Sequence, residues 1–220
     1  MAEIETLTVD EPLGERIERH NFDRLLMLSD GVFAIAITLL VLELRPPEHW
    51  QGGIETLIVA MSRPLFAYGA GFLLIGGYWL IHRRLFAKLR RVDALATGLA
   101  LLLLFLIALV PAVSMLLSVY GPTRFWLVYL MTIAAIGIVQ LTLWSYSALI
   151  ADLADPSLDR RARVNEALKL AVPAVAFATL SGAGLAGVDV TKPLPLLLTI
   201  LPIAVIRRWL GRRSAVSRAS

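Results

Sequence analysis

Four residues have side-chain types from which a hydrolytic or proton-handling site could be built: Ser29, Asp30, His82 and Asp93. Serine, histidine and aspartate together can supply a nucleophile, a general base and the group that orients the base. All four lie near the ends of long apolar runs, where an ionisable side chain can pair with a polar group on a neighbouring helix. We therefore favour a structural contact between helices over a catalytic triad, and we predict no enzyme.

A second set of residues is notable for the lack of polar groups. Between Gly31 and Leu42, Thr38 is the only residue with a polar side chain. In a helix, which turns by about 100° per residue, Ile35, Leu39 and Leu42 fall within an arc of roughly 60°, with Thr38 beside it. One helix face therefore presents stacked aliphatic side chains and one hydroxyl. Such a face can also contact lipid or another helix, and periodicity alone does not decide between these interpretations.

Short motifs for catalysis and cofactor binding are weak or missing in the sequence. It contains no GxxxxGK[ST], no HExxH and no GxSxG, which argues against ATP-driven pumping, zinc hydrolysis and a serine-elbow hydrolase. Residues 182–187 read GAGLAG, but this GxGxxG match lies inside an apolar run rather than after a strand. Small residues every fourth position, from Ala174 to Ala186, are typical of membrane helices that pack closely. The chain has no cysteine, which excludes disulfides, thiolate metal sites and a cysteine nucleophile. We expect no metal site and no cofactor other than the permeant K⁺.

The composition points to a membrane. Of the 220 residues 58% are hydrophobic and 17% are charged, and the mean hydropathy is +0.74, well above that of soluble domains. About 20 apolar residues in a helix cross a bilayer core of about 30 Å. Runs near this length lie at 22–44, 57–82, 93–119, 125–150, 168–188 and 194–210. We predict an all-α integral membrane protein with six transmembrane helices per protomer and no cleaved signal peptide.

The positive charges predict the orientation of these helices. Lysine and arginine gather before the first run, between the second and third, between the fourth and fifth, and after the sixth. The other side carries only Arg45, Arg63, Arg124 and Lys192. Cytoplasmic segments are rich in lysine and arginine, so both termini are expected in the cytoplasm. The net charge of +4 then belongs to an anionic membrane face, not to nucleic-acid binding.

The same borders divide the chain. We expect a cytoplasmic N-terminal tail at 1–21, a six-helix transmembrane domain at 22–210 and a basic cytoplasmic C-terminal tail at 211–220. The charged segment 152–169 is either an interfacial helix leading into the fifth run or a solvated linker, and the sequence leaves both open.

Two stretches of the sequence resemble a known family. Residues 24–30, RLLMLSD, followed by GVFAIAIT, are similar to the RxxxFSD signature of the first helix in prokaryotic relatives of the endolysosomal potassium channel, the transmembrane protein 175 family. Residues 78–86, YWLIHRRLF, and then Asp93 are similar to that family's WxxH and downstream aspartate. The six-run layout agrees over almost the whole chain. Leu28 stands where the family has phenylalanine, so the packing of that ring must be replaced by other side chains.

The resemblance implies a homotetramer in which the first helices surround a central ion path. The pore constriction would be formed by apolar side chains with one possible ring of hydroxyls, at Ile35, Thr38, Leu39 and Leu42. A network at the base of the pore helix would hold that helix in place through Arg24, Ser29, Asp30, Trp79, His82 and Asp93. The implied partners are a second, third and fourth copy of the chain, the lipid bilayer and permeant monovalent cations, in a bacterial plasma membrane.

The mechanism expected from these residues is passive permeation. An unbroken helix uses its own carbonyls, and no TVGYG-like segment is present, so a filter of backbone carbonyls is not expected. A narrow apolar constriction makes an ion shed water, which costs less for K⁺ than for Na⁺, so we predict modest potassium selectivity. The main alternative is a proton-coupled secondary transporter that titrates Asp30, His82 and Asp93. A membrane enzyme and a structural scaffold are the remaining alternatives.

Overall fold

The computed structural model describes residues 13–44 and 52–189, and within these ranges it contains five long helices. They are α1 (Leu13–Leu39), which continues as the 3₁₀ helix η1 (Leu40–Glu43), α2 (Ile54–Phe86), α3 (Ala94–Tyr120), α4 (Pro122–Ser145), which continues as the π-helix η2 (Tyr146–Ile150), and α5 (Arg160–Leu185). Each of the five is long and apolar enough to cross a membrane. The prediction of a helical, multi-pass chain is thus confirmed for these residues, whereas the sixth run at 194–210, the tail at 211–220 and residues 1–12 lie outside them.

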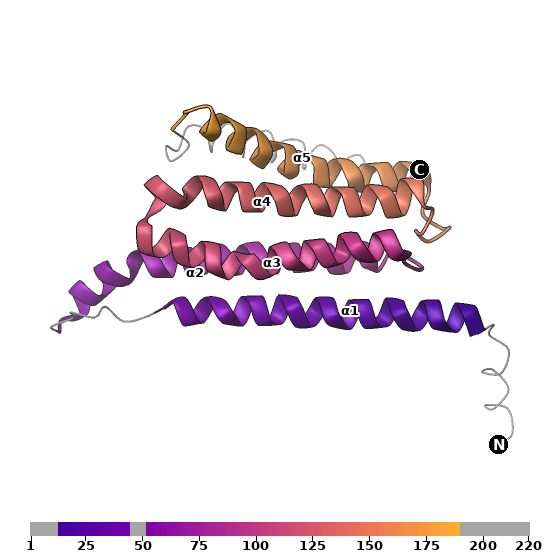
Figure 1. The fold of residues 1–220 in the computed structure, drawn as a ribbon, viewed down its shortest axis with the longest axis horizontal. Helices are drawn as coiled ribbons and strands as arrows, with labels where there is room; N and C mark the ends of the chain where they lie inside the picture. The colour runs from indigo at the N-terminus through magenta and orange to yellow at the C-terminus, as the bar shows by residue number, and fades with distance from the viewer. Residues whose placement is uncertain (1–12, 45–51, 190–220) are drawn as a thin grey trace, which may run out of the picture.

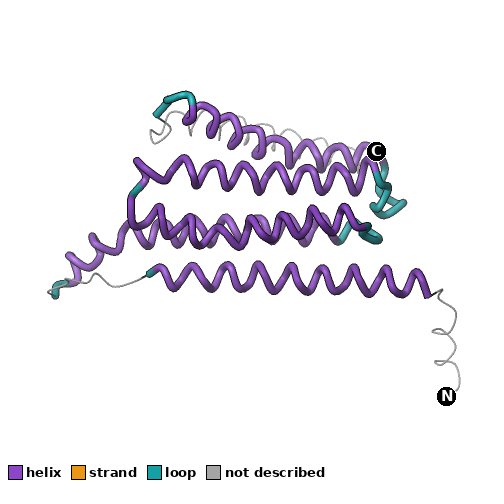
Figure 2. The backbone as a smooth tube through the Cα atoms, viewed as in Figure 1, coloured by secondary structure: helices purple, strands orange, loops and turns teal. Residues whose placement is uncertain are grey.

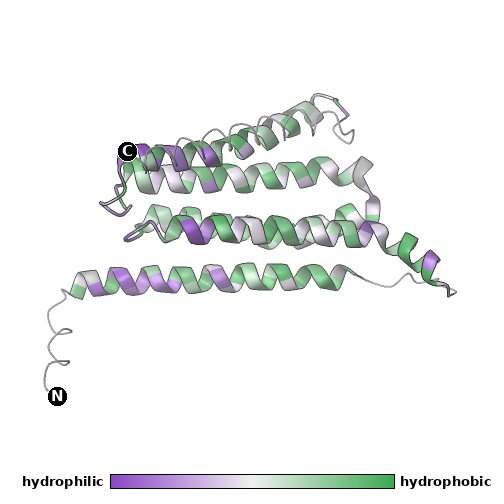
Figure 3. Ribbon diagram, turned by 180° about the vertical axis from the view of Figure 1, so that it is seen from behind, coloured by the Kyte–Doolittle hydropathy of each residue, from purple (hydrophilic) through white to green (hydrophobic). Residues whose placement is uncertain are grey.

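The helices run alternately up and down in one bundle (Figure 1). α1 lies at one edge against α2 and α3, α4 follows α3, and α5 lies against α4 at the other edge. Short loops join α2 to α3, α3 to α4 and α4 to α5 (Figure 2). The start of α1 and the α2–α3 and α4–α5 connections therefore share one end, which we name the basic end, and hydrophilic residues gather there (Figure 3).

Close helix contacts hold the bundle together at two glycines. A Cβ atom added to Gly71 of α2 would lie 2.9 Å from a methyl carbon of Leu40, and one added to Gly137 of α4 would lie 3.2 Å from the Cα of Ala174 in α5. An apolar side chain is solvated equally well by lipid tails and by a neighbouring helix, so the hydrophobic effect does not drive helix association in a membrane. Close packing through small residues favours it instead. Ala174 belongs to the small-residue series of the sequence, and packing explains its place.

Four helices begin earlier than the apolar runs predict: α1 at Leu13, α2 at Ile54, α4 at Pro122 and α5 at Arg160. Helix α2 contains Pro64, and its first turns leave the bundle at an angle (Figure 1). α5 starts at Arg160, after Asp159 accepts a hydrogen bond from the amide of Ala162 at 2.8 Å and so caps the helix. The polar residues 160–168 are therefore the first turns of the fifth spanning helix, continuous with its apolar part.

Candidate functional site

Helix α1 presents two different faces in the protomer. Its buried face, packed against α2 and α3, consists of Leu25, Ser29, Phe33, Ala36 and Leu40. The residues predicted to line a pore lie on another side of the helix, and all of them are exposed: Ile35 (60%), Leu39 (42%), Leu42 (63%) and Thr38. The protomer therefore leaves an aliphatic face uncovered at its edge, which we name the α1 outer face.

The last turn of this helix keeps the outer face in line. The sequence predicts an unbroken α-helix to residue 44, but the chain tightens into the 3₁₀ helix η1 from Leu40. Side chains three residues apart eclipse one another in a 3₁₀ helix, so Leu42 stays above Leu39 rather than drifting around the axis. The hydroxyl of Thr38 donates to the carbonyl of Ile35 at 2.9 Å, which leaves the oxygen lone pairs of Thr38 free to accept or to face a cation.

At the basic end, α1 is joined to α2 by a side-chain hydrogen bond. The indole Nε1 of Trp79 donates to Oδ1 of Asp30 at 2.8 Å. The guanidinium of Arg83 lies over the ring of the same tryptophan, 5.4 Å from its centroid. Ser29 instead donates to the carbonyl of Leu25 in its own helix at 2.8 Å. Arg24 is exposed and makes no hydrogen bond or ion pair within the described ranges.

His82 is enclosed between aromatic rings beside this contact. It is only 1% exposed, and its ring centroid lies 5.6 Å from that of Phe33 in α1 and 4.2 Å from that of Phe86 in α2. Neither ring nitrogen has a hydrogen-bond partner in the part of the chain that the structure describes. His82 therefore packs α1 onto α2 through tilted contacts between aromatic rings.

Asp93 serves a different pair of helices. Its Oδ1 accepts from the amide of Ala96 at 2.7 Å and caps α3, while its Oδ2 accepts from the hydroxyl of Tyr146 at the end of α4. Partial desolvation opposes ionisation of Asp93, but the hydrogen bonds from Tyr146 and Ala96 outweigh it and lower the pKa of the carboxyl below its usual value. The six residues of the predicted network thus include one direct pair, Asp30 and Trp79, whereas Asp93 joins α3 to α4.

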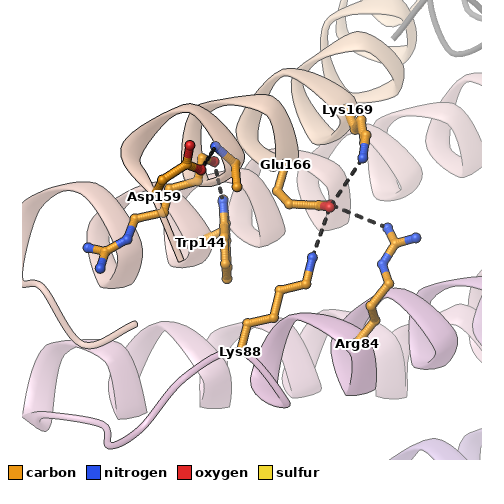
Figure 4. A network of polar contacts seen from close by, with 8 residues as sticks. Arg84, Lys88, Trp144, Asp159, Glu166 and Lys169 are labelled. Atoms are coloured by element: carbon orange, nitrogen blue, oxygen red, sulfur yellow. Dashed lines mark hydrogen bonds and ion pairs between the residues drawn. The ribbon is translucent and has the colours of Figure 1, made fainter. Parts of the chain in front are cut away.

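A charged cluster that the sequence reasoning missed lies at the same end (Figure 4). Glu166 of α5, only 8% exposed, accepts from Lys88 at 2.8 Å and from Lys169 at 3.2 Å, and Arg84 approaches it at 3.7 Å. The ammonium of Lys88 also lies 5.9 Å from the ring centroid of Trp144. One buried carboxylate therefore joins α5 to the end of α2 and the loop after it. The Glu166–Lys169 spacing was visible in the sequence, but the two partners far away in the chain were not.

The two loops of the basic end also bind each other through the backbone. The amide of Arg90 donates to the carbonyl of Leu153, and the amide of Asp155 donates to the carbonyl of Lys88, both at 2.9 Å. Arg163 of α5 donates to the carbonyls of Ala148, Leu158 and Asp155 and to the carboxylate of Asp152. Its hydrogen bond and charge lower the pKa of Asp152. Within 13–44 and 52–189 no three His, Asp or Glu residues could hold a metal ion.

Comparison with known proteins gives consistent matches. Residues 24–111 match the sequence profile of the endosomal/lysosomal potassium channel TMEM175. A potassium channel of Streptomyces collinus is 32% identical over 155 residues, which cover 68% of this chain and 75% of that protein. A potassium channel of Chamaesiphon minutus is 34% identical over 153 residues, which cover 66% of this chain and 75% of that protein. The crystal structure of a lysosomal potassium-selective channel TMEM175 homolog from Chamaesiphon minutus is similar with a TM-score of 0.62 and 29% identity, over 89% of this chain and 98% of that chain.

The five antiparallel apolar helices and these matches define a multi-pass helical membrane protein with the fold of a solved ion channel. The chain belongs to the family of the endosomal/lysosomal potassium channel TMEM175, together with its bacterial relatives. The resemblance drawn from residues 24–30 and 78–86 is thereby confirmed.

Proposed function

We propose that this protein is a passive, modestly potassium-selective cation channel in the plasma membrane of a bacterium. Its two relatives from Streptomyces collinus and Chamaesiphon minutus are named potassium channels, and each match covers 75% of the relative. The observation that carries the proposal for the chain itself is the α1 outer face, a row of aliphatic side chains that no part of the described protomer covers.

The ion path is formed by four copies of this face around a symmetry axis. One helix cannot enclose a pore by itself, so the mechanism needs a homo-oligomer, and a tetramer is the assembly we propose. Ile35, Leu39 and Leu42 form the apolar constriction, which excludes water when narrow and makes a passing ion give up part of its hydration. K⁺ sheds water at lower cost than Na⁺, and the hydroxyl oxygens of Thr38 offer partial replacement between the apolar rings.

The contacts at the basic end hold α1 at a fixed angle and depth. The Asp30–Trp79 hydrogen bond and the tilted contact between the rings of His82 and Phe33 join α1 to α2. Arg24 and Ser29 lie on the same stretch of α1 as Asp30. Asp93 joins the start of α3 to Tyr146, which follows α4. We propose that the basic end faces the cytoplasm, since its loops and helix ends together carry most of the lysine and arginine of the described chain.

The rival function, proton-coupled transport through Asp30, His82 and Asp93, has less support. A transporter of this kind needs titrating groups that exchange protons along one path. Asp30 is bound to Trp79 of α2, whereas Asp93 is bound to Tyr146 of η2 and to the start of α3. These contacts give the carboxylates separate structural tasks in different helix pairs.

The two functions differ in what drives the flux. Purified protein in proteoliposomes with a K⁺ gradient is expected to carry a current that reverses close to the K⁺ equilibrium potential, with or without a pH gradient. Flux that requires a pH gradient in fixed proportion would support the transporter, and no flux at all would leave a scaffold as the function.

A further inference from the structure

A cavity lies at the end of the bundle opposite the basic end. It has a volume of about 220 Å³ and opens between the early turns of α2, the last turns of α3 and the first turns of α4. It is lined by Ser62, Arg63, Phe66, Ala67, Leu117 and Trp126. The α1 outer face contributes nothing to it, so its contents are separate from the proposed ion path.

Two of the lining side chains, Arg63 and Trp126, are hydrogen-bond donors for which the described residues provide no acceptor. Arg63 is exposed beside the α3–α4 turn, where a Cβ added to Gly121 would lie 3.8 Å from its Nη1, and it forms no ion pair among the described residues. The indole Nε1 of Trp126 is shielded from solvent and has no acceptor in the same part of the chain. Ser62 already donates its hydroxyl proton to the carbonyl of Val59 at 2.7 Å. None of the lining residues is acidic, so the polar side of the cavity favours an anion.

The remaining walls are apolar. Phe66, Ala67 and Leu117 offer no polar side-chain atom, and a small soluble anion would leave them against water. Arginine and tryptophan together are typical of the level where the hydrocarbon core meets the headgroups, because each has an apolar body and a polar end. The occupant that fits both halves of the cavity carries an anionic group on an aliphatic chain.

We propose that this cavity is a phospholipid site. The phosphodiester accepts hydrogen bonds from the Arg63 guanidinium and the Trp126 indole N–H, and the first methylene groups of an acyl chain lie against Phe66, Ala67 and Leu117. The volume holds the headgroup region and the start of a chain, and the rest of the lipid stays in the bilayer. With the basic end in the cytoplasm, this lipid belongs to the opposite leaflet.

The test is lipid binding by the full chain in detergent, followed by native mass spectrometry during titration with palmitoyl-oleoyl phosphatidylglycerol. We expect one lipid per protomer in the tightest class, and at least about tenfold weaker binding of that lipid by Arg63→Gln, which loses a charge-assisted donor. The matched control is Arg161→Gln, an exposed arginine at the basic end, which should keep the wild-type affinity. Equal affinity of Arg63→Gln and the wild type would overturn the proposal.

Further measurements separate the lipid from other occupants. Trp126→Phe keeps the ring but loses the N–H, and should weaken the same lipid severalfold; an unchanged affinity would remove the indole from the site and contradict the proposed geometry. Millimolar glycerol 3-phosphate should not displace the lipid, and displacement would mean that the cavity recognises a free phosphate ester.

The alternative occupant of this cavity is a surface of a second copy of the chain. Because the protein has no cysteine, Ser62→Cys introduces a single thiol. Rapid disulfide-linked dimers on oxidation in membranes would show that the cavity faces another protomer and would overturn the lipid site, whereas the proposal predicts monomeric thiol. These readouts do not involve ion flux, so they succeed or fail independently of the channel function.

Discussion

At the scale of residues, the contact between α1 and α2 depends on a hydrogen bond between two residues that are far apart in the sequence. Asp30 and Trp79 are 49 positions apart, and each lies in one of the two stretches that resemble the family. Their proximity was therefore predictable from resemblance, although not from spacing. Tyr146 as the partner of Asp93 was not predictable, because the two are 53 positions apart and no local pattern marks the tyrosine.

Replacing Asp30 by alanine should weaken the assembly. The indole N–H of Trp79 would lose its acceptor at the α1–α2 contact, and the net contribution of such a hydrogen bond is about 0.5–1.5 kcal/mol. We expect a lower fraction of the proposed tetramer in detergent, measured by size-exclusion chromatography with light scattering. Asp23→Ala is the control, since Asp23 is exposed on the same helix. Equal tetramer fractions in the two variants would exclude Asp30 from the supporting role.

Ile35→Asn should change conduction without changing the fold. Ile35 is 60% exposed in the protomer, so an amide at this position costs little packing there. In the proposed pore it would wet the constriction and lower the barrier for both K⁺ and Na⁺. We expect larger currents and weaker selectivity in planar bilayers, whereas Ile35→Val should behave like the wild type. Identical conductance of both variants would place the ion path elsewhere.

At the scale of elements, helices were predictable and their connections were not. Each predicted run within 13–189 overlaps a helix that is long and apolar enough to span a membrane, because length and hydropathy suffice to identify one. The shape of the α4–α5 connection is determined by contacts instead. Helix α4 continues as the π-helix η2, and Asp152 has a left-handed φ of 49°. The guanidinium of Arg163 donates hydrogen bonds to three backbone carbonyls of this region. The sequence of such a loop has no periodicity, so its conformation could not be predicted from the sequence.

Glu166→Gln should loosen α5 from the rest of the bundle. The substitution removes the negative charge that Lys88, Lys169 and Arg84 share around a nearly buried carboxylate. Hydrogen bonds to charged groups contribute about 1.5–3 kcal/mol, so we expect a loss of about 2 kcal/mol in stability. A lower Tm by intrinsic tryptophan fluorescence would show it. Glu55→Gln, an exposed position in the first turn of α2, is the control, and equal Tm values would contradict the role of the cluster.

The carboxyl of Asp93 should make stability depend on pH in the acid range. Because its pKa is lowered in the folded protein, the stabilisation is complete above the unfolded pKa of about 4 and is lost as pH falls through the lower folded value. Asn is also a good helix N-cap, so Asp93→Asn removes mainly the charge. We expect the variant to have a lower Tm than the wild type at pH 7 and a similar Tm near pH 3. A difference that stays constant over this range would contradict the assignment.

At the scale of the whole molecule, hydropathy and charge predicted a bundle of alternating helices whose basic connections share one end. The described chain has that arrangement, with α1 at one edge and α5 at the other (Figure 1). The edge position of α1 was not visible in the sequence, since it depends on which helices pack around α3. It matters for the proposed function because an edge helix leaves its outer face for other copies of the chain.

Silver accessibility of that face tests the pore assignment most directly. Ag⁺ is similar in size to K⁺ and reacts with thiols, and the natural chain has no cysteine to compete. We expect micromolar Ag⁺ to block the current of Ile35→Cys channels irreversibly, and to leave unchanged the wild type and Leu73→Cys, whose leucine is 75% exposed on α2. Persistent current in Ile35→Cys, with block of Leu73→Cys instead, would contradict a pore lined by α1.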